Sequence, residues 1–216
     1  DMSRGLGDVY KRQIFPSCYN PPAEYFLDII NADRKLVIDL AEHFTKQTLR
    51  NRCHILGPNG VLTLVVPVTH NDRTHTAMSD IMIAEDDQWQ RQHWRSLCTA
   101  YNSSPYFEFY KDEFEEIYTL RNIGSLTDLN RKLTFLILKL IGLDVEVSGT
   151  KQWIPPASDN DPRVKYSTGE PLKGLNSYPQ VFTYKYGYTE GLSILDLLFN
   201  KGPETLSYLN SHGDDG

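Results

Sequence analysis

The sequence predicts an α/β protein of one domain, in which a mixed β-sheet with a central hairpin is packed by several helices. Residues 46–68 combine a basic patch, an Asn59-Gly60 pair and a run of apolar β-formers, a pattern typical of a hairpin. Three other stretches repeat apolar residues at helical spacing. We expect all but the first 13 of the 216 residues to be native, and 216 − 13 = 203 residues suit one domain with a sizeable core.

The predicted hairpin has one basic face and one apolar face, because alternate side chains of a strand point to opposite sides. Arg50, Arg52 and His54 share the basic face, and Cys53 and Ile55 share the apolar one. A short turn adds Thr63, Val65 and Pro67 to the first face, and Leu62, Leu64 and Val66 to the second. The basic face suits a phosphate or carboxylate, since guanidinium donors match those oxygens two at a time. The alternative is a solvated face paired with acidic neighbours.

Ahead of the hairpin, the sequence predicts two short strands and one helix. Residues 14–16 are expected to end a first strand, and residues 35–39 to form a second. Between them, Pro21-Pro22 can open a helix that ends near Asn31, because proline is tolerated in the first helical turn. The apolar stripe of this helix consists of Tyr25, Phe26, Ile29 and Ile30.

Behind the hairpin, the sequence predicts a loop, a strand and two helices. Residues 69–79 are polar and predict a loop over one end of the sheet, whereas residues 81–84 predict a strand. An aspartate at 86–87 can cap a helix that runs to about Tyr101. Residues 106–118 are aromatic and acidic, and they predict a second helix against the sheet.

The longest helix is predicted from a capping box at Ser125 and Asp128 to a stop at Gly142. Its apolar residues, at helical spacing, are Leu126, Leu129, Leu133, Leu136, Ile137 and Leu140. Residues 145–147 predict a strand. Residues 151–177 are rich in proline and charge, and predict a long surface loop or lid.

The end of the chain is expected to hold a strand at 181–184 and a short buried helix at 193–200, followed by a last turn to about Leu209. We divide the chain into three parts. Residues 1–13 resemble the translation of a transposon end used in sequencing libraries and are expected to be a non-native leader. Residues 14–209 form the domain, and residues 210–216 are expected to be a disordered tail.

Composition limits the classes of function. The net charge is −6. Without the leader it is −7, because 22 − 3 = 19 basic residues face 28 − 2 = 26 acidic ones. This balance argues against broad nucleic-acid binding. The three cysteines, Cys18, Cys53 and Cys98, form no close pair, which argues against a disulfide framework and favours the cytoplasm. No apolar run reaches membrane-spanning length.

Histidines are the first candidates for chemistry. His93 is the preferred general base, because the unperturbed pKa of histidine lies near neutral pH. The alternative is an ordinary helix histidine packed on the indole of Trp89, one turn earlier. His54 on the basic face and His70 in the following loop are further candidates. His70 and His75 lie five apart with no HExxH or CxxC motif, so the sequence predicts no metal site.

Asp196 interrupts an otherwise apolar helix. Either its carboxylate is buried and orients a base, or it forms a capping box with Ser193; we favour the cap, because buried carboxylates need partners. Cys98 falls on a buried helical stripe without a nearby base and is not expected to be a nucleophile. No Walker loop, dinucleotide fingerprint, GxSxG motif or kinase motif set occurs, so no cofactor is expected.

Five motifs in order resemble the WbqC-like protein family. They are YNPPAEYF at 19–26, KQTLRNR at 46–52 with the strand end VPV at 66–68, Trp89-x-x-x-His93-Trp94, Tyr101-x-x-x-Pro105-Tyr106-Phe107, and LSILDLLFN at 192–200 with Gly202-Pro203. The resemblance covers about residues 16–209. Residues 39–44 lack the Asp-Asp-Val-Gln-type run of many members, and Glu190-Gly191 replaces a Pro-Asn-like pair.

The resemblance implies a cytoplasmic bacterial protein of O-antigen-type cell-surface polysaccharide biosynthesis. It implies a transferase that adds an acyl or aminoacyl group to a nucleotide-linked amino sugar. The alternatives are a non-catalytic nucleotide-sugar or carbohydrate-binding module and a scaffold that docks a biosynthetic protein partner. Neither nucleic acid nor membrane insertion is expected.

Under the transferase hypothesis, the candidate residues take separate roles. Lys46, Arg50 and Arg52 would hold the diphosphate. Trp89 and Tyr25 would line the sugar, and His93 would take the proton of the amine.

Overall fold

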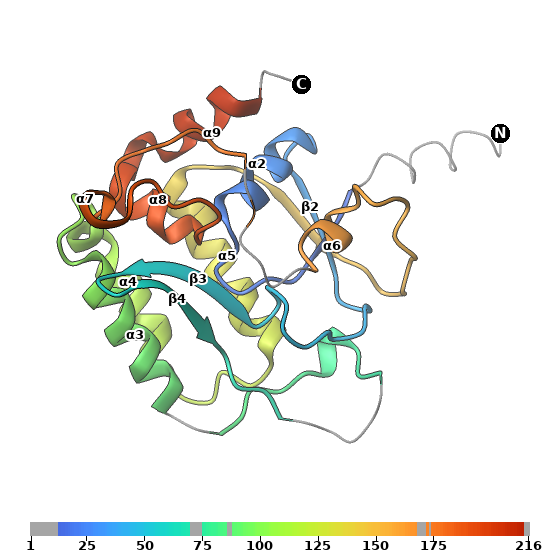
Figure 1. Ribbon diagram of the computed structural model, residues 1–216. Helices are drawn as coiled ribbons and strands as arrows, with labels where there is room; N and C mark the ends of the chain where they lie inside the picture. The colour runs from blue at the N-terminus through green and yellow to red at the C-terminus, as the bar shows by residue number, and fades with distance from the viewer. Residues whose placement is uncertain (1–12, 70–74, 86–87, 168–171, 173, 214–216) are drawn as a thin grey trace.

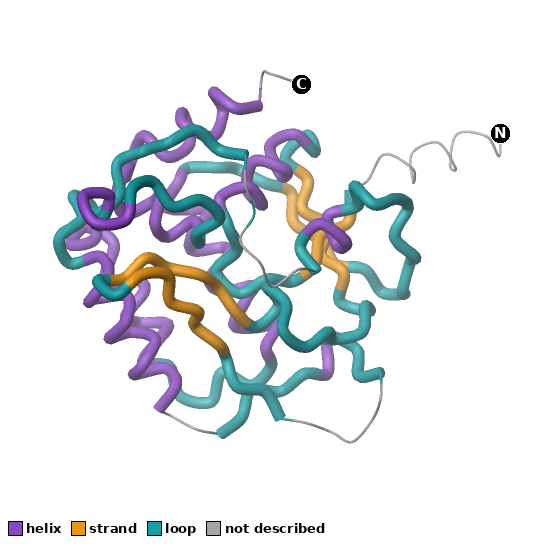
Figure 2. The backbone as a smooth tube through the Cα atoms, in the orientation of Figure 1, coloured by secondary structure: helices purple, strands orange, loops and turns teal. Residues whose placement is uncertain are grey.

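The computed structural model describes residues 13–69, 75–85, 88–167, 172 and 174–213. Figure 1 shows one α/β domain, and Figure 2 shows its strands in two groups with helices around them. One group is a small parallel sheet and the other is an antiparallel hairpin. The predicted fold class, an α/β domain with a hairpin packed by several helices, is therefore confirmed.

The parallel sheet has the strand order β1-β2-β5. These strands span Ile14–Pro16, Lys35–Asp39 and Glu146–Gly149. Pro16 pairs with Asp39, and Ile38 pairs with Gly149. Because all three strands run in the same direction, their carboxyl ends meet at one edge, the edge at which open α/β sheets bind ligands.

The hairpin consists of β3, Arg52–Gly57, and β4, Gly60–Val65. Arg52 lies opposite Val65 and His54 lies opposite Thr63, as a two-residue turn predicts. On the apolar face, Cys53, Ile55 and Leu64 are buried, and only Leu62, at the far end, is exposed. The predicted strand register is confirmed.

The helices surround the two sheets (Figure 1). They are α2 Ala23–Asn31, α3 Gln88–Tyr101, α4 Phe107–Thr119, α5 Leu126–Ile141, α6 Pro162–Lys165, α7 Thr183–Tyr186, α8 Ile194–Lys201 and α9 Thr205–Gly213, with 3-10 turns η1 Met78–Asp80 and η2 Gly202–Glu204. The hydroxyl of Ser125 accepts the amide of Asp128 at 3.1 Å and caps α5 as predicted. Gly142, with φ of 71°, ends α5 in the left-handed conformation that favours glycine.

One large apolar core lies between these elements. Helix α3 packs against β3 and α4, and α5 packs against α4. Phe107, Phe114 and Tyr101 all contact the ring of Phe199, with centroids 5.0–5.4 Å apart, so they join α3 and α4 to α8. Among the described residues, no helix combines the length and apolar character that a membrane span requires.

Three of the predicted elements differ from those in the structure. Residues 81–84 form only single bridges, from Met82 to Ser125 and from Ile83 to Val68, rather than a strand. The segment 181–184 contains strand-forming residues, but among the described residues it pairs with no strand, and it turns into α7. Helix α9 continues to Gly213, so residues 210–213 are helical rather than disordered. The predicted cap at 86–87 lies outside the described residues.

Candidate functional site

Arg50 precedes β3 and ends in a buried ion pair. The residue is 3% exposed. Its Nε and Nη2 donate to the two carboxylate oxygens of Glu42 at 2.8 and 2.6 Å, and its Nη1 donates to Oγ1 of Thr48 at 3.3 Å. The prediction of an open basic face is therefore wrong for Arg50, because an incoming anion would have to displace Glu42.

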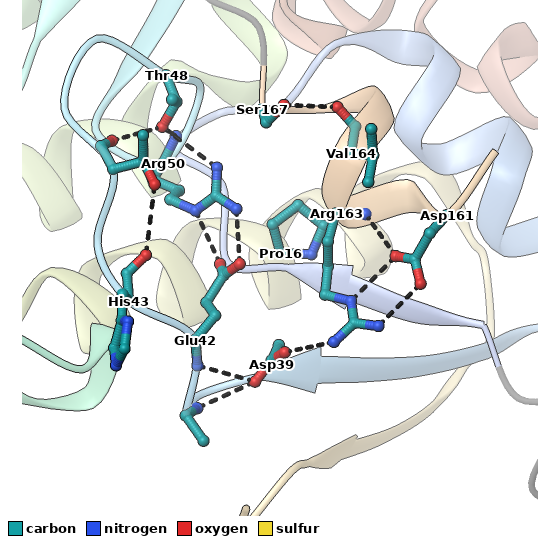
Figure 3. Close-up of polar contacts among 12 residues, drawn as sticks. Pro16, Asp39, Glu42, His43, Thr48, Arg50, Asp161, Arg163, Val164 and Ser167 are labelled. Atoms are coloured by element: carbon teal, nitrogen blue, oxygen red, sulfur yellow. Dashed lines mark hydrogen bonds and ion pairs between the residues drawn. The ribbon is translucent and has the colours of Figure 1, made fainter. Parts of the chain in front are cut away.

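A second buried arginine lies beside this pair (Figure 3). Arg163, from α6, donates through Nη1 to Oδ2 of Asp39 at 2.8 Å and to the carbonyl oxygen of Ile154. Its Nε and Nη2 donate to the carboxylate of Asp161 at 3.0 and 2.8 Å. We call the five charged residues Asp39, Glu42, Arg50, Asp161 and Arg163 the ionic cluster.

Local structure places the acidic members of this cluster. Asp39 ends β2, and its Oδ1 accepts the backbone amides of Ala41 and Glu42 at 3.1 and 3.0 Å, which turns the chain so that Glu42 faces Arg50. Asp161 caps α6 by accepting the amide of Arg163 at 2.9 Å. The cluster therefore lies at the carboxyl edge of β1 and β2.

The charges of the ionic cluster are paired with one another. Burial raises the pKa of Glu42, although hydrogen bonds from Arg50 oppose that rise. Burial acts in the same direction on Asp161, but hydrogen bonds from Arg163 and from backbone amides outweigh it, and the pKa of Asp161 is lowered. Because the carboxylates already engage both guanidinium groups, the cluster holds the 150–167 segment against the sheet and offers no free cation to a substrate.

The other predicted binding residues of the hairpin region lie in different environments. Arg52 is half-buried, and its Nε has no hydrogen-bond partner among the residues that the structure describes. His54 is buried, with Nδ1 3.0 Å from Oγ1 of Thr63. Lys46 is exposed, and His70 lies outside the described residues. A common basic floor does not form from these side chains.

His93 is the end of a buried chain of hydrogen bonds. The Nδ2 of Asn20 donates to the Tyr118 hydroxyl at 2.9 Å, and the hydroxyls of Tyr118 and Tyr19 are 2.6 Å apart. The Tyr19 hydroxyl lies 2.8 Å from Nδ1 of His93, and the ring also bonds the carbonyl oxygen of Val65. Since a carbonyl can only accept, Nε2 of the neutral ring donates to it and Nδ1 accepts from Tyr19.

Burial keeps this imidazole neutral. Loss of water around the ring lowers the pKa of His93 to about 4, and the bond to the Val65 carbonyl opposes that fall only in part. The Trp89 indole meets the His93 ring edge-on, with centroids 5.1 Å apart. This geometry agrees with the alternative of a helix histidine packed on an indole, and a catalytic role for His93 stays a prediction.

An open cleft of about 780 Å³ lies at the amino end of α3. We call it the Trp89 cleft. Its lining comes from three segments and consists of residues 82–85, 88–90 and 122–124. Trp89 is largely buried but is part of this lining. The polar groups of the lining are those of Glu85, Gln88, Gln90 and Asn122. The predicted sugar residue Trp89 is therefore part of a cleft lining, whereas His93 contacts the indole but is not one of the lining residues.

Tyr25 does not line that cleft. Its ring packs against Phe15, Phe26 and Tyr166, with centroids 5.2–5.8 Å apart. Its hydroxyl donates to the carbonyl oxygen of Pro16 at 2.9 Å. Tyr25 is fully enclosed in the core, so the prediction that it lines a sugar pocket is wrong.

Asp196 is a buried carboxylate rather than a cap. Its Oδ2 accepts from the hydroxyl of Tyr178 and from Nε2 of Gln180, each at 2.9 Å, whereas Ser193 caps α8 by accepting the amide of Leu195. The favoured capping box is therefore wrong. Burial raises the pKa of Asp196 to about 6, although these hydrogen bonds oppose the rise. Among the described residues, the carboxylate of Asp196 therefore bonds a tyrosine and an amide rather than a histidine.

Sequence reasoning missed most of the polar residues that the fold brings together. Asp39 carried one usable signal, its place at the end of a predicted strand. Arg163 carried none, because it stands in an irregular, proline-rich segment and reaches a partner 124 positions away. Within the described residues, no group of three or more His, Cys, Asp or Glu side chains could hold a metal ion.

The comparisons with known proteins agree with these sequence motifs. The model of the WbqC-like protein family matches residues 17–168. The chain belongs to the WbqC-like protein family. The matched range contains the ionic cluster and the Trp89 cleft, and it ends before Asp196. The chain is also similar to a protein of Mycobacterium tuberculosis (strain ATCC 25618 / H37Rv) named "Uncharacterized protein Rv1507c", with 26% identity over 229 residues, 92% of this chain and 97% of that protein. No solved structure matches the chain.

Proposed function

We propose that this WbqC-like protein is a cytoplasmic transferase of cell-surface polysaccharide biosynthesis. Its acceptor is a nucleotide-linked amino sugar, to which it adds an acyl or aminoacyl group. Family membership supports the pathway, through the O-antigen association that the sequence resemblance implies. The Trp89 cleft is the observation that carries the binding step.

The Trp89 cleft has the size and lining that a sugar needs. Pockets for small ligands are commonly about 300–1,000 Å³, and this cleft measures about 780 Å³. Trp89 is largely buried and can add only a small apolar contact to a sugar, while the carboxylate of Glu85 and the amide of Asn122 can bond its hydroxyls. Arg50 is not assigned to the diphosphate, because Glu42 occupies its guanidinium.

Amide formation requires the amine to attack the acyl carbon, the leaving group to depart and the amine to lose a proton. The neutral ring of His93 packs against the indole of Trp89 and has one acceptor nitrogen, but the Tyr19 hydroxyl bonds that nitrogen. Acceptance of the amine proton by His93 therefore needs a rearrangement of the Tyr19 hydrogen bond. His93 and Asp196 keep their predicted roles as hypotheses.

Calorimetric titration tests the binding step. We expect a nucleotide-linked amino sugar to bind more tightly than the same nucleotide without the sugar. Glu85→Gln should weaken the sugar complex by about tenfold, since a hydrogen bond to a charged group contributes about 1.5 kcal/mol or more. The control is Glu116→Gln, which also removes an exposed carboxylate, but from α4 and outside the cleft. Equal affinities for both ligands, or equal losses in both variants, would remove the cleft from the proposal.

A mass-spectrometric assay with an acyl donor tests turnover. A gain in sugar mass equal to the acyl group, lost in a folded His93→Gln variant, is the expected result. The second candidate function is a non-catalytic sugar-binding module, which the burial of His93 favours: the residue is 5% exposed. Tight sugar binding without product, for a range of acyl and aminoacyl donors, would select this second function.

A further inference from the structure

The outer edge of strand β4 pairs with no other strand among the described residues. The Gly57–Gly60 pair closes the two-residue turn, so hydrogen-bonded pairs alternate from there along the hairpin. Gly60, Leu62 and Leu64 direct their backbone groups to β3. Val61, Thr63 and Val65 consequently direct theirs outward, and the bond from His93 to the Val65 carbonyl agrees with this direction.

The free part of this edge is apolar and uncovered. Val61 is 49% exposed and Leu62 is 43% exposed. Helix α3 packs against β3, and Lys185 and Tyr186 of α7 donate to the carbonyl oxygen of Pro58 in the turn. The six residues of β4, GVLTLV, include no charged residue and no proline, which are the usual protections of an edge strand. Across the described part of the chain, no strand pairs with this edge.

We propose that a second copy of this chain pairs with β4 in antiparallel fashion and joins the two hairpins into a four-stranded sheet. The two-fold axis passes beside Leu62. In this register Val61 of each copy exchanges backbone hydrogen bonds with Thr63 of the other, because both direct their groups outward. Leu62 then faces Leu62 of the second copy in a close pair, which covers the exposed side chain at the end of the apolar face.

Pairing along β4 lets two copies of the chain meet where neither carries a charged side chain. Each chain carries a net charge of −6, so two copies repel each other over most orientations. The β4 edge brings them together through uncharged side chains only, and no like charges lie opposite one another. The register also leaves Val65 outside the central pairs, where His93 already engages its carbonyl.

The proposal is tested by charged substitutions at Leu62, the residue beside the two-fold axis. Sedimentation velocity of the full chain over a concentration series should show a reversible monomer–dimer equilibrium, weak because few residues pair. Leu62→Lys should raise the dimer dissociation constant about fivefold or more, since it sets two like charges face to face and removes a leucine pair. Leu62→Glu should do the same, and an equimolar mixture of the two variants should recover a heterodimer.

Val65→Lys is the matched control, because it adds the same charge at an equally exposed position of β4, away from the axis. It should keep the dimer within about twofold of wild type. A chain that stays monomeric at every concentration overturns the proposal. So does a dimer that the two Leu62 variants leave unchanged, or a mixture of them that fails to pair, since each result moves the contact away from this register.

Discussion

The neutral, buried state of His93 can be measured as a dependence of stability on pH. The perturbation is acidification of the wild type from pH 7.5 to 5, compared with the same change in His93→Gln. Glutamine does not titrate, yet it can accept from Tyr19 and donate to the Val65 carbonyl in the manner of the neutral ring. The variant therefore removes the titration while it keeps the polarity of the site.

The structure sets the sign and the size of the effect. The folded pKa of His93 is about 4, below the value of 6.5 that applies to the unfolded chain. The contribution of this residue to stability is therefore complete above pH 6.5, falls as the pH drops from 6.5 toward 4, and stays constant below that. Between pH 6.5 and pH 5 the unfolded chain binds a proton at His93 that the folded chain does not. Over this interval of about 1.5 pH units, the free energy of unfolding falls by about 2 kcal/mol.

Urea unfolding at both pH values provides the assay. Subtraction of the variant is essential, because burial raises the pKa of Glu24 to about 7 and that of Asp196 to about 6. Those two carboxyls contribute stability that grows as the pH falls, so they oppose His93 in the wild-type curve. Their contributions cancel when the free energy of unfolding of His93→Gln is subtracted from that of the wild type. This difference should fall by about 2 kcal/mol between pH 7.5 and pH 5.

Gln92→Ala serves as the control, because it changes an exposed, non-titrating residue on the same helix. The difference in unfolding free energy between this control and the wild type should be the same at pH 7.5 and pH 5. If the wild-type and His93→Gln curves also run parallel, the imidazole is not held neutral and the hydrogen-bond direction assigned to it is refuted.

Two further perturbations test the fold around the site. Glu42→Leu should destabilise the protein by about 3–5 kcal/mol in urea unfolding, because it leaves the Arg50 charge buried without its anionic partner. Adding Arg50→Met should recover most of that loss, and a single variant as stable as the double one would contradict a closed ion pair. Gly202→Ala should cost several kcal/mol in thermal unfolding, because its φ is 53° and a Cβ there would lie 2.4 Å from the ring of Tyr106. Gly142→Ala, with φ of 71° and open space around the new methyl group, should cost only about 1 kcal/mol, and equal losses at the two glycines would argue against that contact.

Features set by neighbouring residues were predicted well. The Asn59-Gly60 turn and the alternation of side chains led to the register in which Arg52 faces Val65. The capping box at Ser125 and the stop at Gly142 bounded α5. Each of these depends on backbone geometry over a few residues, which the order of residue types determines directly.

The candidate site was predicted less well, because its chemistry depends on distant partners. The parity argument placed Arg50 on a basic face, but Glu42, in the loop after β2, reaches its guanidinium first. Asp196 was expected to bond its own helix, yet the loop that carries Tyr178 and Gln180 folds over it. Among the predicted site residues that the structure describes, Trp89 is the one found in the lining of the Trp89 cleft.

The sequence by itself determined the periodic elements, the hairpin register and the family, because these follow from spacing along the chain. Tertiary structure decided which charges are free. Arg163 bonds Asp39 across 124 positions, and the Tyr19 hydroxyl meets His93 across 74. The physical reason is that a buried polar group takes the partner that packing brings within about 3 Å, and sequence separation does not limit that choice.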